Sequence, residues 1–250
     1  MSTPDRIALV TGTSSGIGRA IAELLLQSGW TVIGMSRREV GFDSPQYRHI
    51  QQDLADVREL REVAERDLAP MFRETRWSRV GLVNNAALIG SLEPMGQADP
   101  QRVLELFAVN TVAPMFLMGL MVRVAPAAAA LRIVNVSTGA AVNPFPGIGD
   151  YGASKAALRL AGMVLAAETG SDKHPGGPRQ DAAVLSYAPG IVDTAMQDAA
   201  RSSAGPWNDI FVNFHKQGLL QPPEKPAREI LHFLESDGAA PFTERRLGDP

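Results

Sequence analysis

The chain has 250 residues, 45% of them hydrophobic and 20% charged, which is the balance of a soluble globular protein and not of a disordered one. A net charge of −3 without a basic run argues against nucleic acid and anionic membranes as partners, since both attract positive charge. The chain contains no cysteine, which excludes disulfides, thiolate metal sites and a cysteine nucleophile.

Short apolar runs alternate with helical patterns from the first residues onward. The runs predict strands at 7–10, 31–35, 47–51, 80–83, 132–136 and 183–187. Apolar residues at helical spacing predict a first helix that stops at Gly29, and further helices at 55–72, 100–124, 151–168 and 224–234. The most apolar stretch, 109–131, is interrupted by two prolines and an arginine, so it is interpreted as a buried helix and not as a membrane span. The alternation predicts a single α/β domain over 1–250, a doubly wound parallel sheet with helices on both faces.

Three segments lack this regular pattern. The segment 170–180 is a polar turn, 191–221 is expected to be irregular, and the chain beyond 234 is a polar tail. The first six residues are polar and lead directly into a strand, so we expect no secretory signal and a cytoplasmic location.

A glycine-rich turn follows the first strand. Its sequence, TGTSSGIG over 11–18, lets the backbone approach a pyrophosphate at the N-terminus of the next helix, where free N–H groups favour an anion. A tight strand-to-helix turn without a ligand is the alternative, but the alternating α/β context favours nucleotide binding. The predicted contacts are Gly12, Ser14, Ser15, Gly16, Ile17 and Gly18.

The spacing TGxxxGxG resembles the short-chain dehydrogenase/reductase family, which implies a Rossmann-type fold and a nicotinamide cofactor. The second strand ends in Ser36-Arg37-Arg38, where an NAD enzyme typically carries a carboxylate for the ribose hydroxyls. Two guanidinium groups suit the 2′-phosphate of NADP(H), although they could also be solvated loop arginines. We therefore expect NADP(H) as the cofactor.

The resemblance implies cofactor contacts in three further segments of the chain. Asp53 and Leu54 follow the third strand, where the family contacts adenine, and Asn85 and Ala86 belong to NNAA at 84–87, where the family has NNAG. After the sixth strand, the sequence PGIVDT at 189–194 matches the PGxxxT turn that binds the carboxamide. The matching positions are Pro189, Gly190, Val192 and Thr194.

The strongest chemical signal is the YxxxK pattern of Tyr151 and Lys155. These positions lie on one face of a helix, and an ammonium near a phenol lowers its pKa, which makes the phenol usable as an acid or base. The resemblance adds Thr138, thirteen positions before the tyrosine, as the hydroxyl that holds a carbonyl. Ser137 stands beside it as a less favoured substitute. It also implies that Asn110 helps to hold a proton-relay water, with a buried amide at a helix kink as the alternative.

Together these residues predict a carbonyl reductase. Hydride would come from NADPH and the proton from Tyr151. Lys155, Asn110 and a water would then return a proton to the Tyr151 phenolate. The four histidines, His49, His174, His215 and His232, show no ligand spacing, so no metal site is predicted.

Within the family the chain is most similar to sepiapterin reductases, through NPFPG at 143–147 and through the stretches 136–151 and 184–197. This similarity implies a homodimer, or a tetramer, and reduction of vicinal dicarbonyls or side-chain ketones. The aspartate that anchors a pterin near the C-terminus is missing from 238–244, where only Glu244 could serve, so a diketone reductase of the benzil type is favoured over a pterin enzyme. A regulatory NADP-binding protein without turnover is the alternative of another class. The expected substrate pocket includes Phe145, Ile148, Met196, Trp207 and Phe211, each of which could equally be a core residue.

Overall fold

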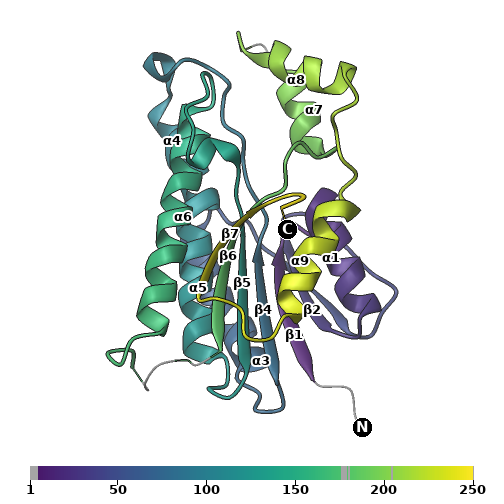
Figure 1. Cartoon of the computed structure of the whole chain (residues 1–250), viewed down its shortest axis with the longest axis vertical. Coiled ribbons are helices and arrows are strands. Elements are labelled where there is room, and N and C mark those ends of the chain that lie inside the picture. The colour runs from purple at the N-terminus through teal and green to yellow at the C-terminus, as the bar shows by residue number, and fades with distance from the viewer. Residues whose placement is uncertain (1–4, 176–178, 180, 204, 250) are drawn as a thin grey trace.

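The computed structural model describes residues 5–175, 179, 181–203 and 205–249 (Figure 1). The polar start at 1–4 and part of the polar turn predicted at 170–180, namely 176–178 and 180, lie outside the described residues.

Seven parallel strands form one sheet in the order β3-β2-β1-β4-β5-β6-β7. The chain builds outward from β1 to β3, then returns to place β4 on the other side of β1, so the order reverses between β1 and β4. Ligands of such sheets bind beyond the carboxyl ends of the strands at this reversal. The strands are β1 (Arg6–Thr11), β2 (Thr31–Ser36), β3 (Tyr47–Gln51), β4 (Arg79–Asn84), β5 (Ala130–Val136), β6 (Ala182–Ala188) and β7 (Phe242–Arg246).

The first six strands confirm the predicted ones, whereas β7 corrects the interpretation of the C-terminus as a polar tail. The sequence of β7, FTERR, contains one strongly apolar residue. Among the described residues this strand pairs only with β6, at the edge of the sheet, and an edge strand does not need side chains that are buried on both faces.

Two hydrophobic cores lie on opposite faces of the sheet, as the alternation of side chains along each strand requires. On β1, Ile7 and Leu9 face one core, which is covered by α2 (Val57–Val63), α3 (Ala69–Phe72), α5 (Ala113–Val124) and α6 (Gly149–Thr169). Ala8 and Val10 face the other, which is covered by α1 (Gly16–Gln27) and α9 (Glu224–Glu235) (Figure 1). The structure is therefore the three-layer α/β fold that the sequence predicts.

Two of the predicted helices contain a wider turn. The helix predicted at 55–72 starts at Val57 and is interrupted by the π-helical turn η1 (Ala64–Leu68). The helix predicted at 100–124 consists of α4 (Pro100–Phe107), the π-helical turn η3 (Ala108–Val112) and α5. Residues Pro100–Val124 are long and apolar enough to cross a membrane by composition, but much of α5 is buried against the sheet. A π-helical turn of this kind often marks a functional site.

The segment 191–221, predicted to be irregular, contains two helices, α7 (Ala195–Arg201) and α8 (Asn208–Lys216). They stand together beyond the carboxyl ends of the strands (Figure 1). Both helices are short and few of their residues are buried, so the apolar pattern there spans too few residues to predict a helix. Short 3-10 turns occur at Met95–Gln97 and Gly139–Ala141.

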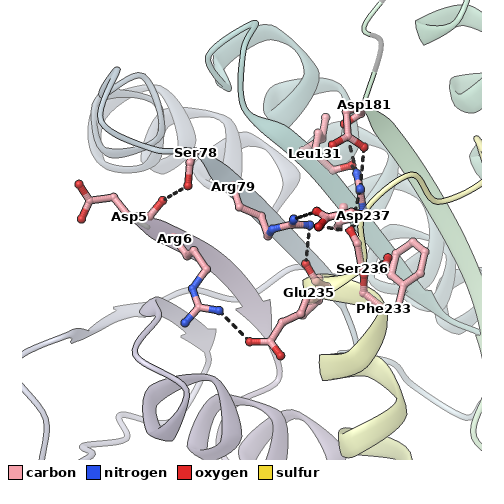
Figure 2. Close-up of polar contacts among 12 residues, drawn as sticks. Asp5, Arg6, Ser78, Arg79, Leu131, Asp181, Phe233, Glu235, Ser236 and Asp237 are labelled. Atoms are coloured by element: carbon pink, nitrogen blue, oxygen red, sulfur yellow. Dashed lines mark hydrogen bonds and ion pairs between the residues drawn. The ribbon is translucent and has the colours of Figure 1, made fainter. Parts of the chain in front are cut away.

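At the opposite end of the sheet, arginines of three neighbouring strands hold the C-terminus of α9 (Figure 2). Arg6 of β1 pairs with Glu235 at 2.8 Å, and Arg79 of β4 donates to the carbonyl of Ser236 at 2.7 Å and pairs with Asp237. Arg132 of β5 is fully buried and donates to the same Ser236 carbonyl at 2.8 Å. The last carbonyls of a helix lack partners within the helix and carry partial negative charge, so these guanidiniums fix α9 to the sheet.

Candidate active site

A cavity of about 750 Å³ opens at the carboxyl ends of the strands, where the strand order reverses. Nearly all predicted cofactor contacts line it; Gly18 does not. A smaller polar cavity of about 400 Å³ near Arg6 and Arg76 lies beside the amino end of β1 and contains none of the predicted site residues. Among the described residues, no group of three or more His, Asp or Glu side chains is placed to hold a metal ion.

The glycine-rich turn has the backbone shape that a phosphate cradle needs. Gly12 and Gly16 have φ values of +77° and +57°, which favour glycine, and a Cβ on Gly12 would lie 2.7 Å from Nδ2 of Asn85. Gly18 lies behind the turn, where a Cβ would collide with the Gly12 carbonyl. The N-terminus of α1 follows directly, and Ser15 makes no side-chain capping bond within the described part of the chain. The first N–H groups of α1 are therefore suited to an anionic group.

A network of hydrogen bonds joins this turn to the segment after β4. Nδ2 of Asn85 donates to the Thr11 carbonyl at 2.9 Å, and Oγ1 of Thr11 accepts from the backbone N–H groups of Asn85 and Ala86 at 3.0 and 3.1 Å. The motif at 84–87 thus sets the position of the turn and lines the cavity beside it.

The two arginines after β2 are exposed and line one end of the cavity. Nη2 of Arg38 donates to Oγ of Ser14 in the glycine-rich turn at 3.1 Å, and Oγ of Ser36 donates to the Arg38 carbonyl at 2.7 Å. The Arg37 carbonyl accepts from Gln51 at 2.9 Å. These bonds hold the backbone in place, and the guanidinium of Arg38 lies against the glycine-rich turn while Arg37 lines the same cavity. Asp53 and Leu54 line the same end.

Tyr151 and Lys155 lie one turn apart on α6, and both line the cavity while being largely buried. Nζ of Lys155 donates to the Val136 carbonyl at the end of β5, at 2.8 Å. Burial lowers the pKa of Lys155 to about 8, because removal from water penalises the charged form.

Burial raises the pKa of Tyr151 to about 12, while the nearby hydroxyl of Thr138 acts in the opposite direction. The net direction differs from the lowering expected from the ammonium, because desolvation of the phenolate outweighs the other effects. Tyr151 is therefore protonated at neutral pH, as a proton donor must be, while the raised pKa makes it a weaker acid than an ordinary phenol.

The two candidate hydroxyls, Thr138 and Ser137, both line the cavity. Oγ1 of Thr138 accepts from the Ala140 N–H at 3.3 Å and starts the short turn Gly139–Ala141. The backbone N–H of Ser137 donates to the Tyr187 carbonyl at 2.7 Å, which continues the pairing of β5 with β6. Thr138 is thus positioned by the turn that it starts, and it lines the same cavity as Tyr151.

Asn110 lies in the π-helical turn η3 and does not line the cavity. Its Nδ2 donates to the Leu88 carbonyl at 2.8 Å and to Oγ of Ser154 at 3.1 Å, and its Oδ1 accepts from the Leu88 N–H at 2.8 Å. This arrangement matches the stated alternative, a buried amide at a helix irregularity. It ties η3 to α6, since Oγ of Ser154 also donates to the Tyr151 carbonyl at 2.7 Å.

Three of the five predicted pocket residues line the cavity, namely Ile148, Met196 and Phe211. The other two do not line it. Phe145 is half exposed, and Trp207 packs on Gly147, where an added Cβ would lie 2.6 Å from the indole ring.

Sequence reasoning missed Leu88, Ile89, Glu105 and Val109, which line the same cavity. The position of Leu88 and Ile89 directly after the NNAA motif is the signal that could have identified them.

Glu244, considered as a pterin anchor, lies on β7 and does not line the cavity. Its two carboxylate oxygens each accept a hydrogen bond from Arg159 of α6, both at 2.6 Å. The same arginine lowers the pKa of Glu244. The carboxylate is therefore engaged in holding β7 to α6.

Comparison with known proteins identifies the family of this chain. Residues 6–205 match the family model described as short chain dehydrogenase, and the chain belongs to that family of oxidoreductases, which use a nicotinamide cofactor. It is 32% identical to a benzil reductase ((S)-benzoin forming) of Bacillus cereus, over 93% of this chain and 95% of that protein. It is 30% identical to the sepiapterin reductase of Bos taurus, over 92% of this chain and 90% of that protein. A short-chain dehydrogenase/reductase structure from Saccharomyces cerevisiae superposes with a TM-score of 0.77 at 25% identity, covering 98% of this chain and 97% of that one.

Proposed function

We propose that this chain is an NADPH-dependent carbonyl reductase that acts on a small ketone or vicinal dicarbonyl, with Tyr151 as the proton donor. The observation that carries the proposal is one cavity that joins the buried pair Tyr151 and Lys155 to the exposed pair Arg37 and Arg38. The benzil reductases among the relatives support a dicarbonyl substrate.

NADPH, when bound, supplies the hydride. The hydroxyls of Thr138 and Tyr151 hold the carbonyl oxygen, and Tyr151 transfers its proton to that oxygen as the alkoxide forms. Lys155, held by the Val136 carbonyl, places positive charge beside the phenolate that remains. The residues at 189–194 and the glycine-rich turn orient the cofactor, while the apolar residues at the far end exclude water from the reacting carbon.

Sepiapterin reductases among the relatives keep a pterin side-chain ketone as the second candidate substrate. The ion pair of Glu244 with Arg159 removes the one C-terminal carboxylate considered as a pterin anchor, which favours the diketone. A regulatory protein without turnover is less favoured, because Tyr151 and Lys155 both line the cavity.

A homodimer of single-domain chains, in the cytoplasm, completes the proposal. Its support is a set of large apolar side chains exposed on neighbouring helices α4, α5 and α6 and on η3, which lie together in Figure 1. A second copy that covers this face would bury them. The residues are Leu104, Val112, Met115, Leu160, Met163 and Val164. Sedimentation at micromolar concentration tests the dimer against a monomer or tetramer.

Assay of NADPH oxidation with benzil, other diketones, simple ketones and sepiapterin tests the activity. We expect turnover with diketones, and we expect Tyr151→Phe to lower kcat about 10³-fold, the typical contribution of general acid catalysis, while the Kd for NADPH stays unchanged. A Tyr151→Phe protein with undiminished turnover would contradict the assigned chemistry. A protein that binds NADPH tightly and oxidises none of it would indicate the regulatory alternative.

Paired variants of the two hydroxyl residues locate the carbonyl contact. We expect Thr138→Ala to lower kcat/KM about 100-fold and Ser137→Ala to change it less than threefold, because only Thr138 affects the Tyr151 phenol. The reverse result assigns the contact to Ser137.

A further inference from the structure

The two ends of the cavity carry opposite charge. Arg37 and Arg38 follow β2 and line the cavity beside the glycine-rich turn, whereas Glu105 lies on α4, which packs against α6, the helix that carries Tyr151 and Lys155. Asp53, the other acidic residue among the described residues that line the cavity, follows β3 at the cofactor end. A ligand beside Glu105 therefore meets a single carboxylate.

The position of Glu105 on its helix explains why it faces the cavity. It precedes Val109 by four residues, one helical turn, and residues at this spacing share a face. Val109 is largely buried and lines the cavity, so the same face of the helix carries Glu105 at the more exposed rim.

Five of the side chains that line the cavity with Glu105 are apolar: Leu88, Ile89, Ile148, Met196 and Phe211. Gln197 of α7, which also lines the cavity, has a side-chain oxygen that is buried and has no hydrogen-bond partner within the described residues. Besides the hydroxyls of Ser137, Thr138 and Tyr151, the cavity thus combines apolar surface with the acceptor oxygens of Glu105 and Gln197.

A neutral hydrocarbon group placed here would displace water from the carboxylate without providing a hydrogen-bond donor in its place, which costs free energy. A group with N–H donors or a positive charge would replace that water, so the site discriminates between the two. We propose that Glu105 determines specificity by binding a cationic or N–H-donating group that the substrate carries on an apolar body, away from its reacting carbonyl. This inference rests on the proposed carbonyl reduction and specifies its substrate class.

Three matched compounds test the inference: 1-phenylpropane-1,2-dione, its para-aminomethyl derivative and its para-carboxylate derivative. With NADPH saturating, we expect wild-type kcat/KM to be about fivefold higher for the aminomethyl compound than for the neutral one, the size of a partly screened ion pair, and lowest for the carboxylate. Glu105→Gln should abolish this order, so that the three compounds have similar kcat/KM values. Raising the salt concentration should narrow it.

Glu93→Gln is the matched control, because Glu93 is exposed, does not line the cavity, and loses the same charge in the segment before α4. Equal kcat/KM for all three compounds in wild type, or a preference that Glu105→Gln leaves intact, would overturn the role of Glu105.

Calorimetric Kd values for the three compounds on NADP⁺-loaded protein separate this inference from the proposed function. A selectivity in Kd that vanishes in Glu105→Gln supports Glu105 even where turnover is absent, a result that would count against the reductase alone. Equal Kd values in wild type would count against Glu105, whatever the turnover.

Discussion

The two ends of β5 each hold a buried cation, and the chain satisfies them differently. Arg132, near the start of the strand, donates to the carbonyls of Leu131, Asp181 and Ser236 and pairs with the Asp181 carboxylate at 2.6 Å. Lys155, at the far end, donates to the Val136 carbonyl, its one acceptor within the described part of the chain. A buried cation with a full set of acceptors holds structure together, whereas one with few acceptors has a shifted pKa and remains available to a ligand.

Replacement of Arg132 tests the buried cation near the start of β5 and should have the largest effect on stability. We expect Arg132→Met to lower the free energy of unfolding by about 3 kcal/mol, because the buried carbonyls of Leu131, Asp181 and Ser236 lose a donor. Urea denaturation at pH 7 measures the change. The ratio of the Kd values for NADPH and NADH should stay as in wild type in the folded fraction.

Arg123→Met is the control for Arg132, since Arg123 makes an exposed ion pair with Glu65 at 2.8 Å. Such pairs contribute about 0–1 kcal/mol, so this variant should unfold almost as wild type does. Equal losses of unfolding free energy in Arg132→Met and Arg123→Met would contradict the distinction between a buried arginine with several acceptors and an exposed one.

Replacement of Lys155 tests the buried cation at the far end of β5, through the pH dependence of stability. Its pKa is about 8 when folded, against 10.5 for the ordinary group, so between these values the unfolded chain binds more protons than the folded one. Wild type should therefore gain stability relative to Lys155→Met as the pH rises from 8 to 10, by about 2 kcal/mol. Tyr151, whose raised pKa lowers stability above pH 10, is present in both proteins and cancels.

Urea denaturation of cofactor-free protein at pH 7, 8, 9 and 10 measures this difference. Lys173→Met, at an exposed lysine, serves as the control and should stay parallel to wild type. A Lys155→Met curve that also stays parallel would show that burial does not shift the pKa of Lys155.

The same contrast explains what the sequence could predict. Strands β1 to β6 and the pair Tyr151 and Lys155 depend on local pattern, whereas Thr138 was implied by the family resemblance. The structure brings these three residues to one cavity. The edge strand β7 was missed, because a strand exposed on one side needs no apolar run. Glu105 was missed for a different reason. Its place at the cavity depends on how α4 packs against the ends of other elements, and a solvated carboxylate on a helix has the same sequence pattern.

Arg132 shows the same limit, since a charged residue within a strand does not reveal which carbonyls surround it. Its acceptors come from positions 131, 181 and 236, which only the folded chain brings together. The arginines after β2 are the opposite case, because their function is proposed from the motif and their exposure leaves them free for a ligand.

Replacement of those exposed arginines should have the smallest effect on stability and a selective effect on binding. We expect Arg37→Ala and Arg38→Ala each to raise the Kd for NADPH about tenfold, because a hydrogen bond from a guanidinium to a phosphate contributes about 1.5 kcal/mol, while the Kd for NADH stays unchanged. Fluorescence titration with both cofactors measures the ratio. Arg6→Ala removes an arginine that pairs with Glu235 at the opposite end of the sheet, and it should leave that ratio as in wild type. If Arg6→Ala shifts the ratio as much as Arg38→Ala does, the effect is transmitted through α9 and α1, which pack together, and the guanidiniums after β2 do not select the cofactor.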